Sequence, residues 1–185
     1  MKRWKQVRWT EAGQITAILG WPQSEHDRDP PEAVFDRLRR EGKDDDAALF
    51  LGQALPRYEV VAWAAQAVRD MSPPDLKPRD AEALEASLQW LRDPNDTRRR
   101  AAFDAALAAS DTSSQRMCAL AVFFSGGSLA PPDLEPLPAP KAAAGSFAAS
   151  AVLTAATDSG RRQEGLRAAL ALGDALAVGS EDGCP

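Results

Sequence analysis

The chain of 185 residues has few side chains suited to metal or nucleophilic chemistry, because it contains one histidine, two cysteines and one tyrosine. His26 alone cannot form a multi-histidine zinc site, a two-histidine metal site or a facial triad. Charged residues and prolines surround His26 in the sequence, so we interpret it as a solvated loop residue. We expect neither a metal site nor a cofactor.

Cys118 lies in an apolar run that extends to Phe124, which is typical of a small residue in a hydrophobic core. A cysteine nucleophile needs a neighbouring base, and His26 lies far away in the sequence. Cys184 stands one residue from the end, so we expect no disulfide, and a reducing compartment suits both thiols. We therefore predict no catalytic residue and a protein that is not an enzyme.

Residues 125–128, Ser-Gly-Gly-Ser, have the composition of a phosphate-binding loop. They follow a predicted helix instead of opening one, and no Gly-Lys-Ser or Gly-Lys-Thr comes after them. The glycines are typical of a left-handed helix end. Five prolines then fall between residues 128 and 140, which predicts a stiff, extended strap across the surface. This strap is a candidate surface for a peptide or protein partner, with candidate residues Ser128, Leu129, Pro131, Pro132, Leu134 and Pro136.

Arg98, Arg99 and Arg100 form the strongest basic cluster of the chain. On a helix, three consecutive side chains spread over most of a turn, so they cannot all face one phosphate. One interpretation is that these arginines are solvated charges on a helix surface. The other is that they contact an acidic partner or a phosphopeptide.

Three tryptophans, Trp4, Trp9 and Trp21, lie among charged residues in the first 30 positions. Either this segment folds back and buries them against the rest of the protein, or it is a basic, aromatic arm that docks on a partner or a membrane surface. Burial is the favoured interpretation, because three tryptophans are rarely left exposed together.

The elements that must position these residues are helices. The chain contains 36 alanines and 19 leucines against 2 isoleucines, 8 valines and 6 threonines, and strands are built largely from β-branched and aromatic residues. We predict an all-α fold, a compact bundle of seven to eight short helices with the Pro-rich strap between helices. The expected organisation is an N-terminal Trp-containing arm over residues 1–30, a helical bundle domain over 31–178 and a loose tail over 179–185.

Local signals place several of these helices. We expect Thr10 to be the N-cap of a helix that ends at Leu19, and the aspartates 44–46 to supply an N-cap and first-turn negative charge for another. The segment Arg57–Met71 is apolar on most sides, so the helix there should be central and buried.

The net charge of −5 and the isoelectric point near 5.0 have the wrong sign for a dedicated nucleic-acid binder. No apolar run approaches ~20 residues, so we expect no transmembrane helix. The N-terminus also lacks the apolar core of a signal peptide. These features predict a cytoplasmic protein.

Two blocks of the sequence carry a resemblance to a known family. Residues 51–57, Leu-Gly-Gln-Ala-Leu-Pro-Arg, are followed by Glu59-Val60 and Trp63-Ala64, and residues 123–132 read Phe-Phe-Ser-Gly-Gly-Ser-Leu-Ala-Pro-Pro. They resemble the AQALP(R/K)REAVWWA and FWSGGSLAPP blocks of an uncharacterised bacterial all-helical family, a domain of unknown function. The chain departs from these blocks at Ala62 and Phe124, where that family often has tryptophan. The resemblance covers roughly residues 50–178.

Members of such families are often encoded beside type VI secretion or forkhead-associated signalling genes. The resemblance therefore implies a partner-binding role and supplies no catalytic residues. Our leading hypothesis is a non-enzymatic cytoplasmic adaptor or accessory protein that acts through protein–protein contacts, and the resemblance implies a bacterial secretion or signalling system as its setting. The alternative is a small-molecule binder or enzyme that uses only Asp, Glu and Arg side chains in a pocket between helices.

Overall fold

The computed structural model describes residues 2–131 and 133–179, and within these ranges the chain forms nine α-helices and no β-strand. The helices are α1 (Ala12–Leu19), α2 (Pro31–Arg40), α3 (Asp44–Ala54), α4 (Arg57–Met71), α5 (Pro78–Arg92), α6 (Asp96–Ala108), α7 (Ser114–Phe124), α8 (Ala143–Asp158) and α9 (Arg162–Val178). The all-α prediction is confirmed, and the number of helices slightly exceeds the predicted seven to eight. Of the predicted tail over residues 179–185, only residue 179 lies within the described ranges.

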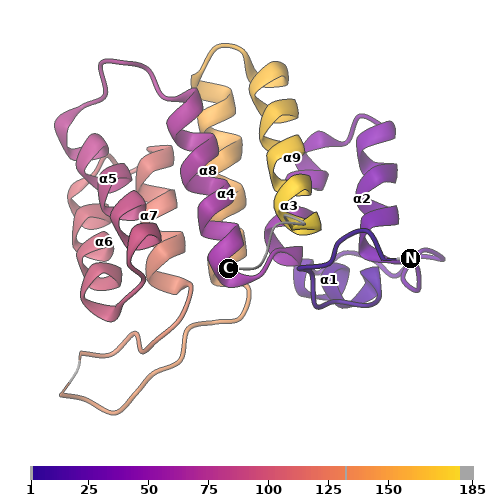
Figure 1. Ribbon diagram of the computed structural model, residues 1–185, viewed down its shortest axis with the longest axis horizontal. Coiled ribbons are helices and arrows are strands. Elements are labelled where there is room, and N and C mark those ends of the chain that lie inside the picture. The colour runs from indigo at the N-terminus through magenta and orange to yellow at the C-terminus, as the bar shows by residue number, and fades with distance from the viewer. Residues whose placement is uncertain (1, 132, 180–185) are drawn as a thin grey trace, which may run out of the picture.

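Helices α4 and α8 occupy the middle of the molecule, with α5, α6 and α7 on one side and α1, α2, α3 and α9 on the other (Figure 1). α8 packs against α3, α4, α7 and α9. The prediction of a central helix over residues 57–71 is confirmed, because side chains such as Val61, Trp63 and Val68 of α4 are fully buried. None of the helices in the described ranges combines the length and the apolar character needed to cross a membrane.

Two glycines allow α3 and α8 to cross closely. A Cβ added to Gly52 would lie 2.6 Å from the carbonyl oxygen of Gly145 and 3.1 Å from the Cβ of Ala149. The next residue, Gln53, donates from Nε2 to the carbonyl oxygen of Ala142 at 3.1 Å and to Ser146 Oγ at 3.1 Å. Because protein interiors are close-packed, the two backbones can approach this closely only while both positions lack a side chain.

The N-terminal tryptophans pack against the helices. Trp4 is fully buried, lies 5.1 Å from the Phe35 ring between centroids, and donates from Nε1 to Asp174 Oδ1 at 2.6 Å. Trp9 donates from Nε1 to the carbonyl oxygen of Gln53 at 2.9 Å. Trp21 is partly buried against the same core. Burial, the favoured interpretation of these tryptophans, is the one that the structure shows.

Two helix starts differ from the sequence predictions. Thr10 is not the N-cap of α1; Glu11 holds that position, and Gln14 Oε1 accepts a hydrogen bond from the Glu11 backbone N–H at 3.2 Å. Gln14 thus accepts from backbone donors that precede the helix. The free first-turn N–H groups of Ala12 and Gly13 donate instead to the carbonyl oxygens of Asp29 at 2.9 Å and Asp27 at 2.8 Å, so the helix start does not depend on Thr10. Lys43 occupies the N-cap position of α3, so the aspartates that follow it contribute first-turn charge and no cap.

A buried carboxylate connects α5 to the loop between α6 and α7. Asp80 is 5% exposed, and its two oxygens accept hydrogen bonds from the Ser110 backbone N–H at 2.8 Å and from Ser110 Oγ at 2.9 Å. Burial alone would raise the pKa of the Asp80 carboxyl, but hydrogen bonds from Ser110 and Ser113 outweigh burial and leave this pKa below its ordinary value. The loop is therefore held by an ionised side chain at neutral pH.

We expect Gly52→Ala to lower the free energy of unfolding by about 1–3 kcal/mol, because the added methyl group overpacks the crossing of α3 and α8. Gly126→Ala is the control, since its Cβ would have its nearest neighbour, Arg57 Nη1, at 3.5 Å. Urea denaturation followed by circular dichroism measures both variants. Equal stability of Gly52→Ala and the wild-type protein would contradict the close crossing.

Asp80 should make the stability of the protein depend on pH. Its pKa is lower in the folded than in the unfolded chain, so it stabilises the fold above the unfolded pKa of about 4, and this contribution is lost as the pH falls through the folded value. Asp80→Asn should therefore remove part of the acid-induced loss of stability below about pH 5. Asp104→Asn, at an exposed carboxylate of α6, should leave it unchanged. Urea titrations between pH 2 and pH 7 test both expectations, and an unaltered acid dependence in Asp80→Asn would refute them.

Candidate functional site

The connection between α7 and α8, residues 128–140, projects beyond the helices (Figure 1). Its middle is exposed to solvent, at Pro131 and over residues 133–138. Leu134 is 59% exposed and Leu137 is 56% exposed. The expected course of this segment across the surface is therefore wrong, since a strap that lay on the helices would bury its leucines against them. Pro132, one of the candidate residues, lies outside the described ranges.

Hydrogen bonds at the base of the 128–140 loop hold its two limbs together. The Leu129 backbone N–H donates to the carbonyl oxygen of Leu137 at 2.8 Å, and Ser128 forms an isolated antiparallel bridge with Pro138. Ser128 Oγ accepts from the backbone N–H groups of Ala130 and Leu137, each at 3.0 Å. Prolines have no N–H to donate, so a serine hydroxyl joins the limbs where a regular ladder cannot form.

Two of the three predicted arginines bind this base. Arg99 donates from Nη2 to the carbonyl oxygen of Ser128 at 2.8 Å and from Nη1 to that of Phe123 at 2.8 Å. Arg100 donates from Nη2 to the carbonyl oxygen of Ala130 at 2.8 Å. The Arg99 guanidinium also lies 4.8 Å from the centroid of the Phe123 ring, within the range of a cation–π contact. The arginines of α6 therefore fix the end of α7 and the start of the loop together.

Asp96, one turn before the arginines on α6, orients both of them. Its Oδ1 accepts from Arg99 Nη2 at 2.6 Å and Nε at 2.9 Å, and its Oδ2 accepts from Arg100 Nε at 2.8 Å. The hydrogen bonds from Arg100 and Arg99 lower the pKa of the Asp96 carboxyl, so it stays ionised at neutral pH. We name Asp96, Arg99, Arg100 and Ser128 the loop anchor.

The structure separates the three arginines that the sequence places side by side. Arg99 is 4% exposed, so its interpretation as a solvated charge is wrong and it presents no surface to a phosphopeptide. Arg98 points away from the loop and bonds to Asp93 Oδ2 at 3.1 Å and Gln89 Oε1 at 3.0 Å. Sequence reasoning missed Asp96, although its spacing of three and four residues from Arg99 and Arg100 is the signal of helical ion pairs.

Gly127 has a second role in the site, beside the left-handed helix end that the sequence predicts. Its φ of +68° belongs to the left-handed region, as expected for a helix end. A Cβ at this position would also lie 2.9 Å from Arg99 Nε. The glycine therefore both turns the chain out of α7 and leaves room for the buried guanidinium.

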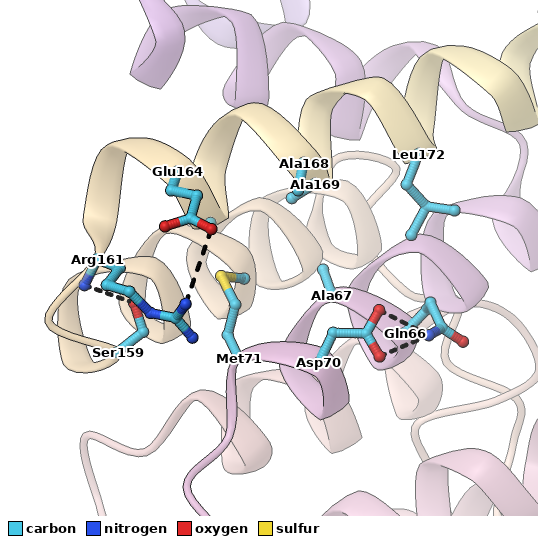
Figure 2. A pocket seen from close by; sticks show the side chains of 11 residues that line it. Gln66, Ala67, Asp70, Met71, Ser159, Arg161, Glu164, Ala168, Ala169 and Leu172 are labelled. Atoms are coloured by element: carbon cyan, nitrogen blue, oxygen red, sulfur yellow. Dashed lines mark hydrogen bonds and ion pairs between the residues drawn. The ribbon is translucent and has the colours of Figure 1, made fainter.

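A pocket between α4 and α9 is one of the cavities in which the alternative hypothesis, chemistry by Asp, Glu and Arg, could operate (Figure 2). Its volume is about 330 Å³. Both oxygens of Asp70 accept from Gln66 Nε2 at 2.7 Å. Glu164 Oε1 lies 3.7 Å from Arg161 Nη1. The Asp70 side chain is 58% exposed and those of Arg161 and Glu164 are 74% exposed. These are hydrated, partnered charges, and the arrangement offers no desolvated acid or base.

The residues considered for metal or thiol chemistry lie apart. Within residues 2–131 and 133–179, no three His, Cys, Asp or Glu side chains come close enough to hold a metal ion. His26 Nδ1 lies 2.9 Å from Asp29 Oδ2. Cys118 is fully buried in α7, and burial raises the pKa of its thiol to about 12. A thiol with this pKa is not a nucleophile at neutral pH.

We expect Arg99→Lys to lower the free energy of unfolding by about 2 kcal/mol, because a single ammonium cannot replace the several charge-assisted hydrogen bonds of the guanidinium. Arg98→Lys is the matched control, and its side chain is 38% exposed, so we expect a change below about 0.5 kcal/mol. Proteolysis within the 128–140 loop should also accelerate in Arg99→Lys alone. Equal stability and equal cleavage rates in the two variants would show that Arg99 does not hold the loop.

Comparisons with known proteins place the chain in a family. A family model described as a family of unknown function (DUF6931) matches residues 34–177. This match begins earlier than the resemblance read from the sequence blocks, and it includes the 128–140 loop and the loop anchor. No curated protein matches the chain, and no solved structure does so. Because the matched region covers most of the sequence, the chain belongs to this family of unknown function, DUF6931.

Proposed function

We propose that this protein is a non-enzymatic, cytoplasmic accessory protein that binds another protein through the 128–140 loop. The observation that carries the proposal is the projecting loop, whose exposed Leu134 and Leu137 are presented by an anchored hairpin base. Two exposed leucines on one protruding element can serve as the apolar anchors of a contact surface. The resemblance to a family encoded near secretion and signalling genes points to a bacterial system of that kind as the setting.

The anchor supports this function because a fixed loop loses little conformational freedom when it binds. Arg99 and Arg100 hold the carbonyl groups of Ser128 and Ala130, while Ser128 Oγ joins the two limbs. Prolines restrict the backbone between these points further. Preorganisation of this kind increases affinity by reducing the entropy cost of association.

The alternative, a small-molecule binder or enzyme in the pocket between α4 and α9, has less support. Its polar side chains are exposed and already partnered, as described above. A catalytic or ligand-binding pocket usually encloses its ligand and directs a few desolvated polar groups into it. The net charge of −5 likewise leads us to propose a protein partner in preference to a nucleic acid.

Affinity co-purification of the tagged protein from its native host, read by mass spectrometry, tests the proposal. We expect the wild-type protein to retain a stoichiometric protein partner and the double variant Leu134→Asp/Leu137→Asp to retain at least about tenfold less, because the leucines would be central to the contact. Leu107→Asp is the control, since Leu107 is 57% exposed but lies on α6.

Circular dichroism should show that both variants keep the helical fold. A single band for the wild-type protein in gentle, low-salt buffer would refute the accessory function. Full retention of the partner by the double variant would refute the assignment of the loop as the contact.

A further inference from the structure

The tip of the 128–140 loop alternates acidic and apolar side chains. Asp133 and Glu135 flank Leu134, and Pro136 and Leu137 follow. All of these residues are exposed. Within the described ranges, neither Asp133 nor Glu135 takes part in an ion pair or a hydrogen bond through its carboxylate. The apolar tip therefore carries two uncompensated negative charges.

The arginines bound to the base of the loop do not neutralise these charges. Arg99 and Arg100 donate their hydrogen bonds to Asp96 and to carbonyl groups at the base of the loop. Lys141 follows Pro140 in the sequence, at the opposite end of the loop from the tip. Many carboxylates elsewhere are paired within the fold, for example Asp45 with Arg162 at 2.8 Å.

We propose that the loop tip docks into a groove of a different protein, with an apolar floor that receives Leu134 and Leu137 and a rim of Lys or Arg side chains that faces Asp133 and Glu135. This inference rests on the proposed function and names the kind of partner. Burial of the two leucines supplies the attraction over a short distance. The two carboxylates favour a cationic surface and disfavour an acidic one, so they select the partner and accelerate the encounter.

A second copy of this chain does not fit that description. Five cavities formed by the described residues each include carboxylates that would face an acidic segment. The cavity beside α2 has apolar walls and two cations, but Arg37 and Lys43 are already paired with the carboxylates of Asp29 and Glu41. The pocket between α4 and α9 has Asp70 and Glu164 against one arginine, and the groove between α5 and α6 has Glu82 and Glu85 on its wall. The cavity beside the start of α3 is lined by three consecutive aspartates. Like charges brought together in this way oppose docking, so we assign the groove to another protein.

The experiment places a photo-reactive, diazirine-bearing amino acid at position 134 of the full chain and crosslinks it in the native host. The crosslinked protein is identified by mass spectrometry and purified, and it then serves as the probe. Its Kd is measured for the wild-type chain and for Asp133→Asn/Glu135→Gln at 50 mM and 500 mM NaCl. Asp75→Asn/Asp104→Asn, at two exposed carboxylates away from the loop, is the matched control.

We expect the loop charge variant to bind about three- to tenfold more weakly than the wild-type chain at 50 mM NaCl, and the difference to shrink at 500 mM, where exposed charges are screened. The control should bind like the wild-type chain at both salt concentrations. Equal binding by the loop charge variant at 50 mM NaCl would overturn the cationic rim while leaving the docking function intact.

Other outcomes overturn the inference in different ways. A crosslink to a second copy of this chain would show self-association. Sedimentation of the wild-type chain with vesicles of phosphatidylcholine and phosphatidylglycerol, abolished in Leu134→Asp/Leu137→Asp, would show a lipid surface instead of a protein groove. The absence of any crosslink from position 134, together with co-purification that does not need the two leucines, would remove the proposed function and the inference with it.

Discussion

A single buried cation, the guanidinium of Arg99, connects the helical bundle to the loop that the proposed function requires. A buried charge is costly unless it is paired and fully hydrogen-bonded. Asp96 supplies the countercharge, and the carbonyl oxygens of Phe123 and Ser128 accept the remaining hydrogen bonds. Those carbonyls belong to the end of α7 and to the loop, so satisfying the charge fixes where the loop leaves the bundle. The planar fork of an arginine can reach all three partners at once.

The bundle provides this anchor with a firm support because its helices approach one another closely. Small residues make the close approach possible, as at Gly52 and Gly145, and buried donors connect helices that are distant in the sequence. Trp63 Nε1, for example, donates to the carbonyl oxygen of Ala169 at 2.7 Å. A tightly packed interior resists deformation. The bundle therefore acts as a platform, and two of the four exposed large apolar side chains of the described residues, Leu134 and Leu137, belong to the loop.

The sequence predicts the parts of this structure that depend on local preferences. Composition predicted helices without strands, and the apolar surface of residues 57–71 predicted a central helix. The buried state of Arg99 could not be predicted in this way, because it depends on carbonyl groups that only the folded chain brings to α6. The direction of the loop was missed for a related reason. Prolines predict a stiff segment, but they do not determine whether it lies on the helices or leaves them, and that outcome depends on the anchor at Ser128.

The size of the loop limits the kind of contact that the proposed function can use. A stable interface of standard size involves about 20–30 residues on each side, whereas the exposed tip presents only a few side chains. A contact made by this tip alone therefore belongs among small, transient interfaces, in which most of the affinity comes from one or two buried anchors. Under that constraint, Arg99 and Ser128 matter as much as the leucines themselves, because an unanchored loop would lose more freedom on binding than two leucines could offset. The proposed accessory role thus depends on a rigid base as much as on an exposed tip.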